Sequence, residues 1–263
     1  ERFKARFALH RIHPYRLRVL LFNTARRFLG DRRLRLALVQ GINRPQILRG
    51  VRGHLGRLLS APIWPLSPWY DRTLHPRSFD RKAAERWLDR AGWRGGRGGK
   101  RWRVDRPLKL RLLRARGETP RRVAEMVTKD LAAIGVEVGI DVADFAFFRT
   151  LLRRGHFDLA VLGLALGRDD DLMAYVHSKG RMNHGHFKNP AIDTMLDALA
   201  KTAVGTDRTR DGRSLHRLLF EDPPMVVLYE PIELMVVNRR VLGLSDDGRW
   251  PDLATLRLKE VAP

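Results

Sequence analysis

The stretch from residue 108 to 142 constrains the fold most, because it has the pattern of a strand, a helix and a strand in succession. Leucines alternate with basic residues over 108–112, which is the period of a half-buried strand. A helical apolar pattern then begins at Pro120 and ends at Gly135, and alternation returns over 136–142. Two strands joined by one helix usually lie parallel with a right-handed crossover, so the sequence predicts an α/β fold.

Further strand and helix patterns surround this unit. Strand patterns are predicted at 19–22, 157–164, 225–229 and 234–237, and helical patterns follow Asp31, Asp80, Phe147 and Asn189. The Pro-rich stretch from Gly53 to Pro76 is expected to be a long ordered loop. We therefore expect a mixed sheet flanked by helices.

The chain is strongly basic and has no cysteine. It carries 51 Lys and Arg against 29 Asp and Glu, a net charge of +22. Such a field attracts nucleic acids, anionic lipids or acidic ligands. The basic residues are spread over all predicted elements, which favours a solvated arginine-rich surface over a nucleic-acid site. The absence of cysteine excludes disulfides, thiolate metal sites and cysteine nucleophiles.

Several segments, in their order along the chain, resemble the family-5 extracytoplasmic solute-binding proteins. In that family a strand ending in Asn-Thr precedes a helix with a conserved arginine, and a helix ending in Ala-Gly-Trp follows later. The matching segments here are Leu21–Thr24, Asp31–Ala37, Gly41–Arg44, Phe79–Trp93, Phe157–Ala160, Asn183–Asp193 and Asp222–Tyr229.

The resemblance implies the second lobe of a clamshell protein, periplasmic-binding-protein-like (type II, cluster C). Residues 1–22 would be a crossover strand region returning from a missing N-terminal lobe, 23–245 the C-terminal solute-binding lobe, and 246–263 a C-terminal return segment. Such a protein is a non-catalytic monomer that needs no cofactor. It binds a peptide or another small molecule and delivers it to the permease of an ABC importer. Its location is periplasmic, or extracytoplasmic and membrane-anchored.

The same resemblance suggests where a peptide's α-amino group would be held. Family members that bind peptides use an aspartate closing a Gly-Trp-x-x-Asp pattern, and the corresponding run here is Gly163–Gly167, with Leu164 in the Trp place. The nearest acids, and our candidate ligand contacts, are Asp169, Asp170 and Asp171. A two-residue shift brings Asp169 into this role. The alternative is a solvated acidic loop, or an N-cap for a helix over 172–176.

Aromatic residues of the Pro-rich loop are a second set of candidates. Trp64, Trp69 and Tyr70 are predicted either to line a pocket wall or to pack the loop against the lobe.

The matched segments Asn183–Asp193, Leu21–Thr24 and Asp31–Ala37 contain further candidate residues. Asn183 and Phe187 are expected on a ligand-side loop. The pair His184 and His186 lacks a third ligand nearby, so no metal site is predicted. Arg35 and Asn23 are expected to be structural, Arg35 as the partner of a carboxylate.

Enzymatic functions find little support. The sequence has no Gly-x-Ser-x-Gly elbow, no His-Glu-x-x-His and no Gly-x-Gly-x-x-Gly after a strand. Glu230 and Glu233 are predicted to be surface charges between two strands. The sequence therefore indicates a protein that is not an enzyme.

Two other functions stay open. The first is the ligand-sensing domain of a cytoplasmic DNA-binding regulator, the one case in which nucleic acid is a partner. The second is a basic interaction module without ligand. The sequence ahead of this chain distinguishes the first from a transport protein, since a lipoprotein signal and a helix-turn-helix differ.

Overall fold

A six-stranded mixed sheet forms the centre of the computed structural model, which describes residues 6–14, 16–26, 28–166, 172–202, 205–244, 248 and 250–259. In spatial order the strands are β3 (Gly56–Arg57), β10 (Met225–Pro231), β2 (Arg16–Phe22), β9 (Leu159–Ala165), β7 (Lys109–Ala115) and β8 (Glu137–Ala143). Strand β7 pairs parallel with β8 and with β9, and the other pairs are antiparallel. The predicted strand–helix–strand unit and the mixed sheet are therefore confirmed.

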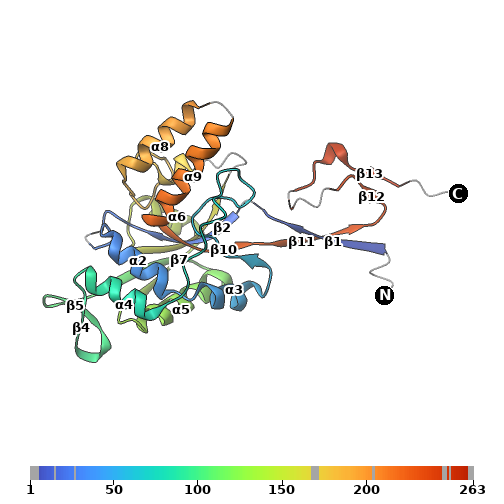
Figure 1. Cartoon of the computed structure of the whole chain (residues 1–263). Helices are drawn as coiled ribbons and strands as arrows, with labels where there is room; N and C mark the ends of the chain where they lie inside the picture. Colours follow the sequence, from blue (N-terminus) through green and yellow to red (C-terminus); the bar gives the residue numbers. More distant parts are fainter. Residues whose placement is uncertain are drawn as a thin grey trace.

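Helices cover both faces of this sheet (Figure 1). One face carries α2 (Arg32–Gly41), α3 (Arg44–Arg52), α4 (Arg81–Arg90) and α5 (Glu118–Ala132). The other carries α6 (Phe145–Arg153), α7 (Met173–Val176), α8 (Pro190–Lys201) and α9 (Thr206–Glu221). Side chains of Asp31, Asp80 and Asn189 accept hydrogen bonds from backbone N–H groups in the first turns of α2, α4 and α8, which explains where these helices begin.

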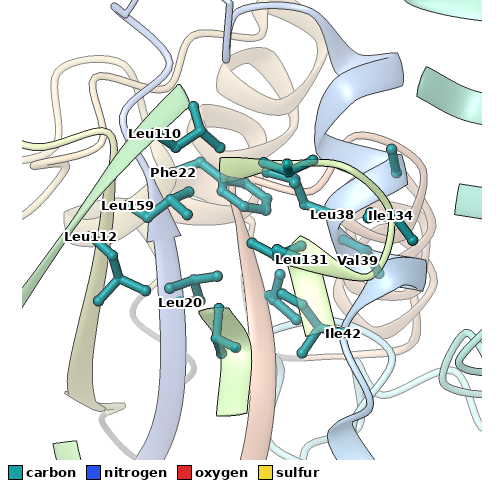
Figure 2. Packing of buried hydrophobic residues seen from close by; sticks show 14 of the residues in the cluster. Leu20, Phe22, Leu38, Val39, Ile42, Leu110, Leu112, Leu131, Ile134 and Leu159 are labelled. Atoms are coloured by element: carbon teal, nitrogen blue, oxygen red, sulfur yellow. The ribbon is translucent and has the colours of Figure 1, made fainter. Parts of the chain in front are cut away.

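Strand β2 divides the interior into two cores because its side chains alternate between the faces. Leu20 and Phe22 pack with α2 and α5, whereas Val19 and Leu21 pack on the opposite side. Figure 2 shows the first core, with Leu20 and Phe22 beside Leu131 of α5. A strand buried on both faces needs a continuous apolar run, which is why Val19–Phe22 has no polar residue.

A two-stranded ribbon leaves the lobe. Strands β1 (Phe7–Ile12) and β11 (Glu233–Asn238) pair antiparallel and extend away from the helices (Figure 1). Apolar side chains on this ribbon are exposed, among them Leu9 at 62% and Val236 at 51%. Beyond it lie β12 (Val241–Leu242) and β13 (Arg257–Leu258). A separate small sheet contains β4 (Arg94–Gly95), β5 (Arg101–Arg103) and β6 (Arg106–Pro107).

The structure differs from the sequence analysis in several elements and in one buried charge. Helix α9 was not predicted, because its sequence is mostly polar and only Leu215 and Leu219 among its leucines are fully buried. Glu230 was predicted to be a surface charge, and this is wrong. Its side chain is completely buried and forms an ion pair with Arg57, while His13 lies 3.6 Å away. The local strand pattern does not show that Arg57, which is remote in the sequence, pairs with this carboxylate.

Candidate functional site

Three strand ends meet at one edge of the sheet. Strands β7, β9 and β10 run in the same direction, so their carboxyl ends lie together, beside the start of antiparallel β2. Two adjoining cavities of about 490 and 370 Å³ meet here, and Arg18, Gly163 and Leu164 line both. From this point the larger cavity extends along the sheet to Leu21 and Met225. Ligands of open α/β sheets bind outside the carboxyl ends of such strands, so this edge is the candidate site.

The larger cavity has an apolar interior. Leu21 of β2, Leu164 of β9 and Met225 of β10 line it from the sheet, and Phe148 and Leu152 line it from α6. All five side chains are buried, with exposed fractions of 6% or less. Such a surface holds an apolar group of a ligand by removing it from water.

Arginines surround this interior. Arg18, Arg116, Arg149, Arg153 and Arg181 all line the larger cavity, and all but Arg18 are exposed. Within the part of the chain that the structure describes, none of these five guanidinium groups has a hydrogen-bond or ion-pair partner, and the cavity has no acidic lining residue. The site is therefore strongly positive.

A histidine lines the same cavity. Burial lowers the pKa of His184, and electrostatic repulsion by Arg153 and then by His186 lowers it further. The His184 ring is thus neutral at neutral pH, as expected beside uncompensated cations.

The smaller cavity connects the site to the ribbon. Tyr229 and Pro231 of β10 and Glu233 of β11 line it together with Arg16 and Arg52. The Arg52 side chain donates a hydrogen bond of 3.0 Å to the carbonyl of Ile232. The ribbon therefore begins directly at the site.

The segment around α7 is fixed by backbone contacts. Tyr175, which lines the larger cavity, donates its hydroxyl to the carbonyl of Ala165 at 2.8 Å. The Asn183 amide donates to the carbonyls of His177 and Phe187, and its oxygen accepts from the Phe187 N–H. Asn183 thus shapes the loop that brings Met182 and His184 to the cavity, whereas Phe187 itself is 2% exposed and packs in the core. The sequence pointed to this loop but not to its cavity-lining members.

The aromatic residues of the Pro-rich loop lie elsewhere. Trp69 is buried against Gly212 of α9, and the Tyr70 ring contacts that of His216 in a tilted arrangement with ring centroids 4.7 Å apart. Trp64 is 2% exposed, and neither tryptophan nor Tyr70 lines either cavity at the strand ends. In the structure these residues pack the loop against the lobe, the second of the two alternatives.

Arg35 and Asn23 hold segments together. The buried Arg35 guanidinium forms an ion pair with Asp222 and donates to the carbonyls of Leu29 and Pro223. The Asn23 amide donates to the carbonyl of Phe157 at 2.9 Å and to that of Gly155 at 3.0 Å. Both residues therefore satisfy backbone acceptors that folding buries.

The candidates Asp169, Asp170 and Asp171 lie outside the described residues. They follow β9, whose last residues, Leu164 and Ala165, line the cavities.

One serine–histidine contact resembles part of a hydrolase site, but its hydrogen bond runs in the wrong direction for catalysis. The Ser60 hydroxyl lies 2.9 Å from Nε2 of His216. Nδ1 of the same ring accepts the backbone N–H of Asp71 at 2.8 Å, so the ring proton resides on Nε2. Nε2 therefore donates to Ser60 and cannot act as its general base. Among the described residues, no cluster of three metal-binding side chains is present and no helix is long and apolar enough to span a membrane.

Comparisons with known proteins agree with the fold. The model of bacterial extracellular solute-binding proteins, family 5 (middle part), matches residues 3–183. Protein XP55 of Streptomyces lividans is 29% identical over 241 residues, which are 90% of this chain and 44% of that protein.

Two solved structures are similar over almost the whole chain. The oligopeptide-binding protein AppA of Bacillus subtilis, in complex with a nonapeptide, matches with a TM-score of 0.82 at 20% identity, over 97% of this chain and 53% of that one. HbpA2 of Haemophilus parasuis matches with a TM-score of 0.84 at 19% identity, over 97% and 50%. The chain thus spans about half the length of these relatives.

Proposed function

The chain belongs to the bacterial extracellular solute-binding proteins, family 5, as the sequence resemblance indicated, and we propose that it is one lobe of a two-lobed protein that captures a peptide or a peptide-like solute. Proteins of a solute-binding family bind and release their ligand without transforming it. This agrees with the expectation that the chain is not an enzyme.

The observation that carries the proposal is the pair of adjoining cavities at the strand ends. They combine an apolar interior with polar groups at the rim, the composition typical of small-molecule sites. The similarity to AppA, whose solved structure contains a nonapeptide, supports a peptide as the solute. Leu164 and Ala165 at the end of β9 would contact that solute.

The ribbon of β1 and β11 supports a second lobe. It leaves the sheet beside the smaller cavity and exposes apolar side chains such as Leu9 and Val236. The chain spans about half the length of its relatives. In the longer protein this ribbon would connect the lobe to the remaining half. We place the first lobe on this side, with residues 1–22 and 246–263 in the connection.

The proposed mechanism is closure of the two lobes on the solute. A ligand that contacts both lobes binds the closed form more tightly than the open one, so it shifts the population toward the closed form. The closed, loaded protein then docks on the permease of an ABC importer outside the cytoplasm.

The test is to purify the longer protein that carries this chain and to identify by mass spectrometry the small molecules that copurify with it. A copurified peptide supports solute capture. Nucleic acid in place of a small molecule would favour the regulator alternative, and an empty protein that binds no peptide in a library screen would contradict the proposal.

A further inference from the structure

The larger cavity has an apolar interior and a positively charged lining, a combination that suits an acidic ligand better than a neutral one. Resting on the proposed function, we propose that this cavity selects solutes in which an apolar group adjoins one or more oxyanions, either carboxylates or a phosphate ester. The apolar group would fill the interior formed by Phe148, Leu152 and Leu164, and the oxyanions would contact the arginines around it.

The cavity lining carries an excess of positive charge. Arg18, Arg116, Arg149, Arg153 and Arg181 contribute five positive charges to the lining, and no described lining residue is acidic. Elsewhere on this basic chain many arginines have carboxylate partners, as Arg121 has Glu118 and Glu125. No described carboxylate contacts the five lining arginines, so the positive charge of the lining is not compensated within the cavity.

The three aspartates that follow β9 in the sequence carry less charge than these five arginines. Asp169, Asp170 and Asp171 carry at most three negative charges. Five arginines exceed them by two, wherever the aspartates lie.

Two of the lining arginines lie close together on α6. Arg149 and Arg153 are four residues apart and therefore on one face of the helix, where like charges repel. Both are exposed, and both line the cavity. Within the described chain no carboxylate contacts either of them. An oxyanion bound between the two guanidinium groups would relieve this repulsion. The pair therefore favours binding of an acidic ligand.

The guanidinium group is suited to binding an oxyanion. Its planar array of N–H donors matches the two oxygens of a carboxylate or a phosphate, and the bonds are short and charge-assisted. Next to an apolar wall such bonds are less screened than in open solvent. The neutral His184 on the same wall offers a further polar contact.

The experiment is an NMR-monitored titration of the longer protein that carries this chain, with three probes. The probes are the tripeptide Leu-Phe-Glu and its neutral counterpart Leu-Phe-Gln, both acetylated at the N-terminus and amidated at the C-terminus so that the glutamate carboxylate is their only charge, and phenyl phosphate. We expect the acidic tripeptide to bind at least about tenfold more tightly than the neutral one, with amide shifts at Gly163 and Leu164. Tighter binding of phenyl phosphate than of Leu-Phe-Glu would identify a phosphate as the preferred oxyanion, and the reverse order a carboxylate.

Two double variants distinguish direct contact between the ligand and the cavity arginines from attraction by the net charge of the protein. Arg149→Gln with Arg153→Gln removes two charges from the cavity and is expected to abolish most of the preference for the acidic tripeptide. Arg94→Gln with Arg106→Gln removes the same charge from the β4–β6 sheet, which contributes no residue to this cavity. This control is expected to keep the preference.

Two results would overturn the inference. The first is equal affinity for Leu-Phe-Glu and Leu-Phe-Gln, which would leave the proposed peptide capture intact. The second is an equal loss of preference in both double variants, which would assign the effect to net charge alone. If none of the three probes shifts the amides at the cavity, both the inference and its assignment as the solute site are contradicted.

Discussion

His216 is fully buried between α9 and the Pro-rich loop, and it makes the stability of this lobe dependent on pH. Burial lowers its pKa to about 4, and the neighbouring Arg217 lowers it as well, against an opposite effect of Asp71. Protonation would place a second proton on Nδ1, where the ring already accepts the N–H of Asp71. Two donors would then face each other in a site without water contact.

The magnitude follows from the difference between the two states. In the unfolded chain the pKa returns to about 6.5, so between pH 6.5 and 4 the unfolded state binds a proton that the folded state does not. The contribution of His216 to stability is complete above this range and is lost as the pH falls through it. The slope is about 1.4 kcal/mol per pH unit, which amounts to about 2 kcal/mol between pH 7.5 and pH 5.

The assay is urea unfolding of this chain at pH 7.5 and at pH 5, compared with a His216→Asn variant. The asparagine oxygen replaces Nδ1 as acceptor for the Asp71 amide but does not titrate. Asp71 itself, whose pKa is held at about 2 by hydrogen bonds from Thr73 and then Arg217, stays charged in this range.

We expect the wild type to lose about 2 kcal/mol more than the variant on acidification, whatever the variant's stability at neutral pH. Equal losses in the two proteins would refute the reasoning, because His216 would then titrate alike in both states.

Three other outcomes are expected. Asp222→Ala leaves the buried Arg35 without its counter-charge and should cost about 3 kcal/mol or more in urea unfolding; an unchanged midpoint would show that the ion pair contributes nothing. Gly212→Ala places a methyl group 2.2 Å from Cγ of Trp69 and should cost about 2 kcal/mol, whereas the control Gly139→Ala, with no atom within 4 Å, should change stability by less than about 0.5 kcal/mol. This chain alone should bind a solute of the longer protein at least about a hundredfold more weakly than that protein does in calorimetry, and equal affinities would contradict closure of two lobes.

Much of the fold was predictable because it depends on local patterns. The alternation at 108–112 and at 136–142, with the helix between, identified the parallel pair of β7 and β8. Asp80 and Asn189 marked the first turns of α4 and α8 as N-caps. Helix α9 was not predicted, because its mostly polar sequence has too few apolar residues on one face to indicate a helix.

The candidate site was only partly predictable. The sequence directed attention to the end of the strand at Leu164 and to the loop at Asn183, and the cavity is lined at both places, by Leu164 itself and by the neighbours of Asn183. The arginines around the cavity were not identified, because Arg18 and Arg149 are 131 positions apart and arginine is abundant throughout. Nothing local distinguishes them from solvated surface charges.

The sequence by itself therefore determined the order of strands and helices, the caps and the family, since each depends on neighbouring residues or on an ordered set of motifs. Only the tertiary structure decided which charges lie in the interior and which surround the cavity. It paired Glu230 with Arg57 and Arg35 with Asp222, and it left Arg149 and Arg153 without partners among the described residues. The physical reason is that burial and electrostatic pairing depend on distances in space, which the folding of remote segments sets.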